Sequence, residues 1–224
     1  MLSIVIPTLN AARHLPRSLP PLAALEAAGL VREVILSDGG SSDETLAVAE
    51  AAGAAVISGP AGRALQLRAG AQAARGPWLL FLHADTALAP GWAAEARVFM
   101  ETGEGRAAAF RFACDEPSPE GQAMTRWVAR RCRWLKLPYG DQGLLISKSF
   151  YEELGGFREL PFLEDVDLVR RIGAQRLSML QTEAETSAEK YRRDGFRRRT
   201  WRNLALVTAY YLGVPAERLA RHYD

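Results

Sequence analysis

Short apolar runs alternate with longer amphipathic segments over the first hundred residues of the chain. The apolar runs predict buried strands over residues 2–6, 34–37, 54–58 and 78–82. The segments between them carry apolar residues on one face and predict helices over residues 41–52, 62–74 and 90–100. This β-α-β-α order is typical of a largely parallel sheet with helices on both faces, so we predict an α/β fold.

The segment after the first strand predicts an irregular helix. We expect Pro7 to end the strand, and Asn10 is placed to cap the helix that follows. The apolar face of this helix would consist of leucines at helical spacing, namely Leu15, Leu19, Leu22 and Leu25. Prolines at positions 16, 20 and 21 interrupt a regular helix, so the pattern does not fix its bounds.

The pattern changes after Thr102, where strands and helices no longer alternate regularly. Further strands are predicted over residues 107–113, 144–147 and 177–181. Further helices are predicted over residues 121–134, 148–154, 164–172 and 196–212, and the last of these is amphipathic. We find no internal repeat, low-complexity tract or linker, so we predict one domain over residues 1–224.

Composition and charge indicate an ordinary globular protein. The chain has 224 residues, of which 48% are hydrophobic and 24% charged, and its net charge of +2 gives no general affinity for polyanions. No nucleic-acid-binding module is recognisable, so we expect no nucleic-acid partner. Cys114 and Cys132 are too few for a disulfide framework and are expected in the core of a protein in a reducing compartment. We see no signal peptide and no bilayer-spanning run, and we expect a cytoplasmic protein.

Two of the predicted buried strands are followed by an aspartate. Asp38 follows the strand at residues 34–37, and Asp85 follows the strand at residues 78–82. In open α/β sheets, ligands bind beyond the carboxyl ends of the strands. Two carboxylates at that edge suit a nucleotide and its metal ion, so nucleotide-dependent chemistry is the first hypothesis.

Several sequence blocks, in their order along the chain, resemble family 2 glycosyltransferases. They are Ile4–Asn10, Ser37–Thr45, His83–Thr86, and the stretch from Gly155 to Leu168 that contains Glu164-Asp165. They extend from residue 4 to about residue 172. The runs Gly140–Gly143 and Gly62–Gln66 further resemble a small bacterial subgroup of that family with a His-Ala-Asp metal motif.

The resemblance implies a GT-A fold, with a mostly parallel central sheet and helices on both faces. It also implies a nucleotide-diphospho-sugar donor, a divalent metal ion (Mn²⁺ or Mg²⁺) and inversion at the anomeric carbon. We expect a UDP-sugar first and a GDP-sugar next. Residues 1–102 would then form the nucleotide-binding half, and residues 103–224 the acceptor half.

The nucleotide site is expected at the first two strand ends. The resemblance places Asp38 against the nucleobase or ribose, where a carboxylate accepts hydrogen bonds. The alternative is that Asp38 only caps a helix, and we favour capping for Ser41, Ser42 and Asp43. The other residues expected at the nucleotide are Pro7, Thr8, Asn10, Gly39, Arg63, Asp85, Lys190 and Arg193.

The metal motif departs from the family pattern. Asp85 matches the last aspartate of a DxD-type motif and is expected to bind the cation, which prefers oxygen ligands. His83 occupies the place of the first aspartate. Its imidazole could bind the metal, donate a hydrogen bond to a phosphate, or simply pack.

The catalytic base is expected in the Glu164-Asp165 pair. An inverting transfer needs one base that deprotonates the acceptor hydroxyl, and the resemblance assigns this role to Asp165. Glu164 would orient Asp165 or bind acceptor hydroxyls. The alternative is that both acids complement a helix dipole, which explains Glu164 but not the match to the whole block.

The acceptor side is expected at Gly140, Asp141 and Gln142, where polar groups on a loop could bind a sugar or phosphate. The alternative is an ordinary β-turn. The acceptor itself is expected to be a sugar or a lipid-type molecule.

Two basic clusters contain tryptophan. The first is Arg126, Arg130, Arg131, Arg133 and Lys136, with Trp127 and Trp134; the second is Lys190, Arg192, Arg193, Arg197, Arg198, Arg199 and Arg202, with Trp201. Such clusters suit an anionic membrane surface or a diphosphate, and the usual alternative is a solvated face. We expect one or two of Lys190, Arg192 and Arg193 to contact the donor diphosphate, and the other basic residues to lie on the surface.

Together these features predict a metal-dependent inverting glycosyltransferase. The alternative is a non-catalytic scaffold of the same fold that binds a nucleotide-sugar. The missing first aspartate of the metal motif favours the scaffold, and the intact Glu164-Asp165 pair favours the enzyme. A nucleotidyltransferase would need a glycine-rich phosphate loop after the first strand, and residues 7–12 contain none.

Overall fold

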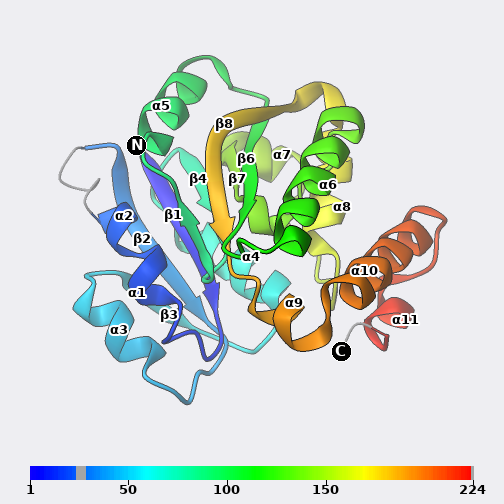
Figure 1. The fold of residues 1–224 in the computed structure, drawn as a ribbon. Coiled ribbons are helices and arrows are strands. Elements are labelled where there is room, and N and C mark those ends of the chain that lie inside the picture. The colour runs from blue at the N-terminus through cyan, green and yellow to red at the C-terminus, as the bar shows by residue number, and fades with distance from the viewer. Residues whose placement is uncertain (24–28, 223–224) are drawn as a thin grey trace.

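A curved mixed sheet forms the centre of the molecule (Figure 1). The structure is a computed structural model that describes residues 1–23 and 29–222. Within this part of the chain the sheet has eight strands in the order β3-β2-β1-β4-β7-β6-β8-β5. The strands are β1 (Leu2–Thr8), β2 (Val31–Asp38), β3 (Ala55–Ser58), β4 (Trp78–Phe81), β5 (Thr86–Leu88), β6 (Ala107–Cys114), β7 (Leu144–Ser147) and β8 (Leu177–Thr186).

The first half of the sheet is parallel. β1 pairs with β2 on one side and β4 on the other, with Ile4 opposite Val34 and Leu80, and β2 pairs with β3. β7 then runs antiparallel to β4 and β6, whereas β6 and β8 are parallel. Because β1, β2 and β4 run in the same direction, the loops after Thr8, Asp38 and Phe81 lie at one edge of the sheet. The predicted α/β fold with a mostly parallel sheet is confirmed.

Helices cover both faces of the sheet, because successive strand residues point to opposite sides. On one face, Ile4 and Ile6 belong to an apolar cluster with Leu15 and Trp92. On the other, Val5 belongs to a cluster with Leu67, Phe150 and Leu168. The helices of these two layers are α1 (Leu15–Ser18), α2 (Pro20–Ala23), α3 (Thr45–Ala51), α4 (Arg63–Ala73), α5 (Trp92–Thr102), α7 (Lys148–Glu153) and α8 (Glu164–Ile172).

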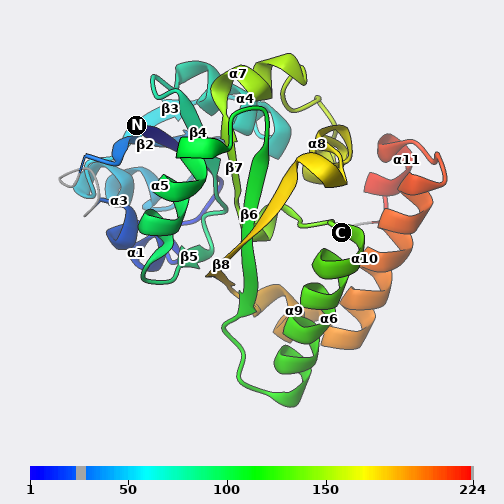
Figure 2. The same ribbon diagram turned by 90° about the horizontal axis from the view of Figure 1, so that it is seen from above.

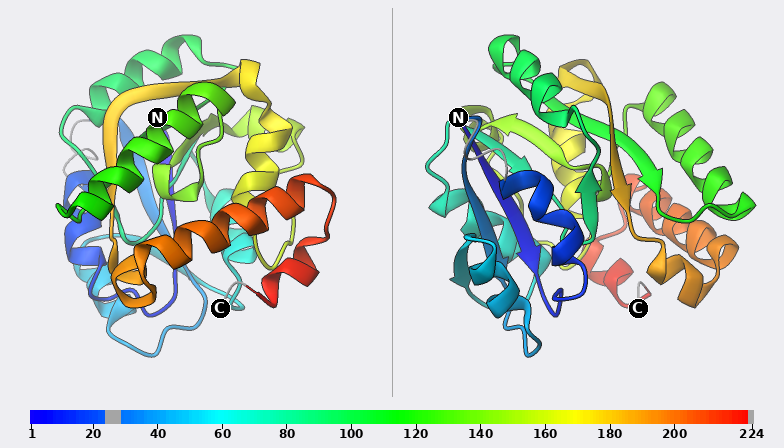
Figure 3. Two further views of the ribbon diagram at one scale, coloured as in Figure 1. Left: turned by 45° about the vertical axis from the view of Figure 1, so that its right-hand side comes forward. Right: turned by 60° about the vertical axis from the view of Figure 1, so that its left-hand side comes forward.

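Two longer helices lie next to each other beyond β6 and β8 (Figures 2 and 3). They are α6 (Pro119–Leu135) and α10 (Phe196–Tyr211), and α9 (Glu189–Asp194) and α11 (Ala216–Ala220) flank α10. Met124 and Val128 of α6 pack on Phe112 of β6, whereas Leu206 of α10 packs on Phe162 before α8. Two 3₁₀ turns, η1 (Gly140–Gln142) and η2 (Ala174–Arg176), complete the described elements. None of the described helices is both long and apolar enough to cross a bilayer.

Pro7 does not end the first strand, contrary to the prediction. β1 continues to Thr8, which lies opposite Asp38 of β2. The carbonyl of Val5 accepts a hydrogen bond from Leu82 N–H (3.0 Å), so Val5 and, two residues later, Pro7 face β4. The pairing with β4 ends at Val5, so the N–H that proline lacks is not needed there.

The loops after β1 and β2 bind each other instead of capping helices. Asn10 has a φ of 51°, its Oδ1 accepts a hydrogen bond from Ser42 N–H (2.9 Å), and its N–H donates to Ser41 Oγ (2.8 Å). The predictions that Asn10 caps the next helix and that Ser41 and Ser42 begin another are therefore wrong. Those helices begin at Leu15 and Thr45. Leu25, predicted on the first helix, lies outside the described residues.

Other element bounds agree closely, with some additions. β7 and α8 have the predicted bounds, whereas β8 extends to Thr186, five residues beyond its predicted end at 181. The short elements β5, α9 and α11 were not predicted. Cys132 is buried beside Val128 as expected, and Cys114 is half-buried against the same cluster.

Candidate active site

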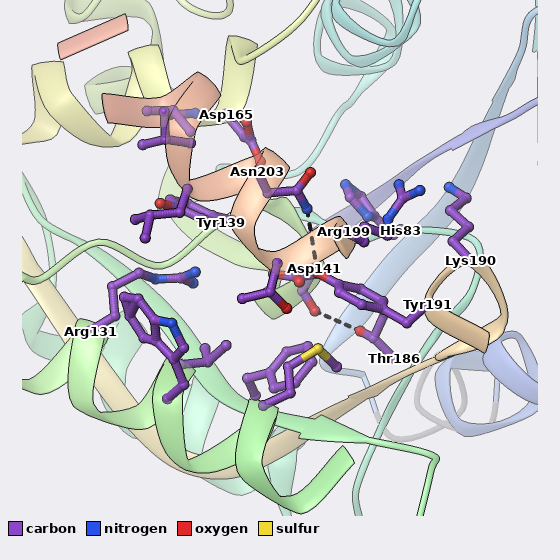
Figure 4. Close-up of a pocket in the computed structure, with 18 of the residues that line it drawn as sticks. His83, Arg131, Tyr139, Asp141, Asp165, Thr186, Lys190, Tyr191, Arg199 and Asn203 are labelled. Atoms are coloured by element: carbon purple, nitrogen blue, oxygen red, sulfur yellow. Dashed lines mark hydrogen bonds between the residues drawn. The ribbon is translucent and has the colours of Figure 1, made fainter. Parts of the chain in front are cut away.

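A cavity of about 180 Å³ opens where the loop after β4 meets η1 and the start of α8. Figure 4 shows His83, Asp141 and Asn203 among the side chains around this space. The titratable residues that line it come from distant parts of the chain, and they are Arg63, His83, Asp85, Arg131, Tyr139, Asp141, Asp165, Lys190, Tyr191 and Arg199.

The imidazole of His83 is neutral at physiological pH. Burial lowers the pKa of His83 to about 4, and the nearby Arg63 guanidinium acts in the same direction. Among the described residues, no side chain or main-chain group hydrogen-bonds to its ring nitrogens. A neutral imidazole with a free nitrogen lone pair can bind a cation or accept a hydrogen bond.

Asp165 remains a carboxylate at neutral pH. It lies in the first turn of α8, its Oδ2 accepts a hydrogen bond from Gly140 N–H (2.7 Å), and its Oδ1 accepts one from Val166 N–H (2.8 Å). Burial by itself raises the pKa of Asp165, but the Arg63 guanidinium and the Gly140 N–H outweigh it and hold the pKa below its usual range. Since a carboxylate offers about four acceptor positions, Asp165 can still accept a proton from a ligand hydroxyl.

Gly140 brings His83 and Asp165 together. A Cβ atom built on Gly140 would lie 2.6 Å from His83 Nε2 and 3.1 Å from Asp165 Oδ2. The first distance is shorter than any normal contact, so a larger residue at this position would require the His83 ring to move. The role of Gly140 in the structure is therefore steric, together with its N–H donor.

Glu164 holds Arg63 in place. Its carboxylate is 1% exposed, and its Oε1 accepts a hydrogen bond from Arg63 Nε. Burial raises the pKa of Glu164, and the Arg63 guanidinium opposes that rise. Arg63 in turn lines the cavity, and its positive charge lowers the pKa of both His83 and Asp165. Glu164 therefore affects the site indirectly, by holding Arg63.

Asp141 and Gln142 behave differently although they are adjacent. Asp141 Oδ1 is buried and has no hydrogen-bond partner among the described residues. Gln142 is 1% exposed, its Nε2 donates to the Phe110 carbonyl (2.9 Å), and its Oε1 accepts from Arg131 (3.1 Å). Gln142 therefore fixes the turn from inside, whereas Asp141 faces the cavity.

Replacing Asp141 with asparagine is expected to stabilise the ligand-free protein above pH 6. Burial, opposed by Arg131, raises the pKa of Asp141 from 3.8 to about 6. Between those values the folded state binds more protons than the unfolded state, so the free energy of unfolding falls as pH rises. Asparagine removes this destabilisation of the folded state, which is on the order of 3 kcal/mol.

Thermal unfolding at pH 4 and pH 7.5 measures the effect. The melting temperature of Asp141→Asn should exceed that of the wild type at pH 7.5 and nearly equal it at pH 4. The same difference at both values would show that the carboxyl is not held protonated by its surroundings.

The predicted nucleotide residues at the ends of β1 and β2 form a separate group. The carboxylate of Asp38 is 1% exposed and accepts hydrogen bonds from Thr8 Oγ1 (3.1 Å), Ser41 Oγ (2.5 Å), Gly40 N–H (2.9 Å) and Ser41 N–H (2.8 Å). Burial raises its pKa, but these donors outweigh burial and keep the pKa low. A ribose hydroxyl would have to replace one of these donors.

Gln66 of α4 joins this group to the cavity, and the sequence did not single it out. Its Nε2 donates to the carbonyls of Thr8 (2.6 Å) and Ser37 (2.8 Å), and its side chain lies 3.1 Å from the position of a Cβ on Gly39. Arg63 lies one helical turn before Gln66. The same helix thus positions both the strand ends and a cavity cation.

The remaining predicted residues divide between the cavity and the surface. Asp85 lines the cavity, and its carboxylate has no hydrogen bond within the described residues. Lys190 also lines the cavity, whereas Arg193 is exposed and its Nε donates to Asp194 Oδ1 (2.7 Å). Pro7 and Asn10, like Asp38, are not among the described residues that line it.

The donor set partly fits a divalent cation. Asp85 and Asp141 each present carboxylate oxygen to the cavity, and His83 presents a neutral imidazole. No group of three or more such side chains lies close enough to hold a metal by itself within residues 1–23 and 29–222. The fit therefore requires ligand oxygens, as a diphosphate would supply.

Two basic residues predicted at the surface point inward. Arg199 is 6% exposed and donates to Asp194 Oδ2 (2.5 Å). Arg131 is half-buried, lies 3.6 Å above the Tyr139 ring, and donates to the Leu137 carbonyl (2.9 Å). Helical spacing from Met124 and Val128 puts position 131 on the apolar face of α6, and that signal could have identified Arg131.

The chain resembles known proteins in sequence over most of its length. A family profile described as glycosyl transferase family 2 matches residues 3–158. Among curated proteins, the PGL/p-HBAD biosynthesis glycosyltransferase of Mycobacterium tuberculosis is 40% identical over 100 residues, which cover 39% of this chain and 36% of that protein. The protein of the same description from Mycobacterium bovis matches equally. The match thus spans about a third of the length of these relatives.

Solved structures show the same fold. S. aureus TarS 1-349 in complex with UDP-GlcNAc has a TM-score of 0.65 at 18% identity, covering 83% of this chain and 58% of that one. Glucosyl-3-phosphoglycerate synthase from Mycobacterium tuberculosis, in complex with Mn²⁺, UDP and glucosyl-3-phosphoglycerate, has a TM-score of 0.60 at 22% identity, covering 83% and 70%. The expected GT-A fold is confirmed by these similarities.

Proposed function

The chain belongs to glycosyl transferase family 2, and from this we propose that it transfers a sugar from a nucleotide-diphospho-sugar to a hydroxyl acceptor with inversion at the anomeric carbon. The observation that carries the proposal is the ionised Asp165, held by Gly140 N–H beside His83 in a cavity that also receives Asp85 and Lys190. A UDP-sugar is the first candidate donor, and a GDP-sugar the next. The structural relatives in complex with UDP-GlcNAc, or with UDP and Mn²⁺, support that order.

Asp165 is the proposed general base. An inverting displacement requires a group that accepts the proton of the acceptor hydroxyl while that oxygen attacks the anomeric carbon. Because the pKa of Asp165 is held below its usual range, the residue is in the required state before the acceptor binds. Gly140 N–H orients the carboxylate, and Glu164 acts on it through Arg63.

The donor diphosphate is assigned to the edge that Arg63, Asp85 and Lys190 share. Arg63 and Lys190 bring positive charge to the part of the cavity beside Asp85, and this charge favours a diphosphate as it leaves. Asp85, with His83, would hold the divalent cation, which when bound neutralises charge on the diphosphate. Asp38 and the loops after β1 and β2 would bind the nucleoside, because they lie at the same edge of the sheet.

We also propose that the two halves of the chain bind different substrates. Residues 1–102 supply the nucleotide half, and residues 103–224 the acceptor half, including Asp141 and the helices α6 and α10. A cytoplasmic location with a peripheral contact to anionic lipid is also part of the proposal. Trp134 and Trp201 are 75% and 70% exposed on helices with exposed arginines, and this supports the lipid contact.

A thermal-shift screen of UDP-sugars and GDP-sugars with Mn²⁺ tests the function, followed by detection of released nucleoside diphosphate. A ligand that binds only the folded state raises the melting temperature by mass action. A shift with one nucleotide-sugar, and release of its diphosphate on addition of an acceptor, are expected. Tight binding without release for any acceptor would favour the non-catalytic scaffold of the same fold.

A further inference from the structure

Part of the cavity lining is apolar, although the cavity also holds carboxylates. Phe162, Leu163 and Val166 surround the start of α8, next to Asp165. Val128 of α6 and Val207 of α10 line the opposite walls. A sugar hydroxyl placed against these apolar side chains would lose its hydrogen bonds to water and gain none from them, which is unfavourable.

A groove between α6 and α10 adjoins this apolar part of the cavity. The cavity and the groove share Met124 and Trp127 on one side, and Thr200 and Leu204 on the other. The groove has a volume of about 420 Å³ and reaches the surface beside Trp201. We call the cavity and the adjoining groove together the α6–α10 channel. Asp165 lines its inner part, and Trp201 lines its outer part.

One polar side chain in the cavity lining has an acceptor oxygen with no partner in the described part of the chain. Asn203 of α10 donates from Nδ2 to Tyr191 Oη (3.4 Å), as Figure 4 shows, and its Oδ1 is buried with no partner among the described residues. A buried acceptor of this kind normally binds a donor. A hydroxyl group on a molecule within the channel would provide one.

The outer part of the channel exposes apolar surface. Trp127 is 36% exposed and Trp201 is 70% exposed, and both line the groove. Exposed patches of this kind commonly mark sites that a ligand covers. Because the channel continues to Asp165, the molecule that covers it also reaches the reacting end of the cavity.

We propose, on the basis of the glycosyltransferase function, that the acceptor is a hydroxyl-bearing amphiphile. Its hydroxyl reaches Asp165, and its alkyl or aryl portion lies in the α6–α10 channel between Met124 and Leu204. In the transfer, the acceptor oxygen forms the new bond to the anomeric carbon and its proton moves to Asp165. The bond to the donor diphosphate breaks, and the diphosphate keeps that electron pair.

The test measures binding of n-alkyl β-glucosides of increasing chain length by calorimetry, below their micelle concentrations. The association constant of the wild type should rise by a factor of about two to four for each added CH₂ group until the channel is filled. Leu204→Glu should weaken binding of the longest probe at least tenfold. Ala205→Glu, on the exposed side of the same helix, is the matched control and should bind like the wild type.

A second variant covers the case in which Leu204→Glu does not fold. Thr200→Trp fills the junction of cavity and groove without adding charge and should also abolish the chain-length dependence. A constant affinity across the probe series, or equal weakening by Ala205→Glu and Leu204→Glu, would overturn the proposal. Equal binding of phosphatidylglycerol vesicles by wild type and Leu204→Glu, with no chain-length-dependent binding of the probes, would also overturn it and would leave the tryptophans only the membrane contact.

UDP binding in the presence of Mn²⁺ separates this proposal from the function on which it rests. All channel variants should retain it, because Leu204 and Thr200 belong to α10, whereas Arg63 and Asp85 belong to α4 and to the loop between β4 and β5. Absence of nucleotide binding in the wild type would count against the glycosyltransferase function. Nucleotide binding without chain-length-dependent probe binding would count against the amphiphilic acceptor only.

Discussion

Replacing Asp165 with asparagine is expected to reduce sugar transfer by a factor of about 10²–10⁴, the usual contribution of a positioned base. Asparagine keeps the size of the side chain, and its oxygen can still accept the hydrogen bond from Gly140 N–H. It cannot accept the proton of the acceptor hydroxyl. Donor affinity should stay within about threefold of the wild type, because Asp38, Asp85 and Lys190 remain. Calorimetry and turnover on the same preparations measure both quantities.

Two further variants show whether the effect belongs to Asp165. Glu164→Gln should be milder, because Glu164 acts on the site through Arg63. Asp141→Asn removes a second carboxylate from the same cavity and tests it as an alternative base. Full activity of Asp165→Asn together with loss in Asp141→Asn would move the assignment to Asp141. Full activity of both would exclude either carboxylate as the base.

The parallel half of the fold could be predicted because its signals are local. Each of β1, β2 and β4 is a short apolar run, and a helix begins within a few residues of most strand ends. The edge position of Asp38 and Asp85 follows from strand direction alone. The loop that contains His83 and Asp85 therefore had to lie near the loops after β1 and β2, whatever the details of packing.

The meeting of His83 with Asp165 required more than local signals. Gly140 allows it, because a Cβ atom there would overlap with the His83 ring and crowd the Asp165 carboxylate. The sequence shows a glycine at that position, but it does not show which side chains lie around it. The resemblance predicted Asp165 at the site. The structure shows that the absence of a side chain at Gly140 leaves room for Asp165 beside His83.

The errors concern hydrogen bonds between residues distant in sequence. Asparagine is a residue type that often caps helices, so Asn10 was predicted as a cap. Its side chain instead accepts a hydrogen bond from Ser42 N–H, on the loop after the next strand. Gln142 was predicted to contact the acceptor substrate. Its side chain is instead hydrogen-bonded to the Phe110 carbonyl and to the Arg131 guanidinium. A polar side chain has several possible partners, and only the folded chain decides which of them is near.

The α6–α10 channel was equally invisible to sequence patterns. Met124 and Leu204 are each typical of an inward-facing helix position, and either would ordinarily be assigned to a core. In the structure Met124 packs with Phe112 and Leu206 packs with Phe162, and Phe196 at the start of α10 packs against the Met124 cluster as well. Helical periodicity is the same for a side chain that fills a core and for one that lines a cavity.

Replacing Asp85 with alanine is expected to abolish the strengthening of UDP binding by Mn²⁺. Asp85 lines the cavity and has no protein partner in the described part of the chain, so its carboxylate is available to a cation. Loss of an outer hydrogen-bond partner typically costs a metal site 10–100-fold in affinity, so loss of a direct ligand should cost at least that much. UDP alone should bind wild type and variant about equally.

Calorimetric titration of UDP with and without Mn²⁺ measures the difference, and titration in EDTA gives the metal-free reference. His83→Ala is the informative companion, because His83 stands where the family has another aspartate. If His83 is a ligand, its variant should lose part of the metal-dependent gain; if it only packs or contacts a phosphate, the gain should survive at lower overall affinity. Equal UDP affinity with and without Mn²⁺ in the wild type would remove the cation from the proposal. Arg63 and Lys190 would then be the groups that neutralise the charge of the diphosphate.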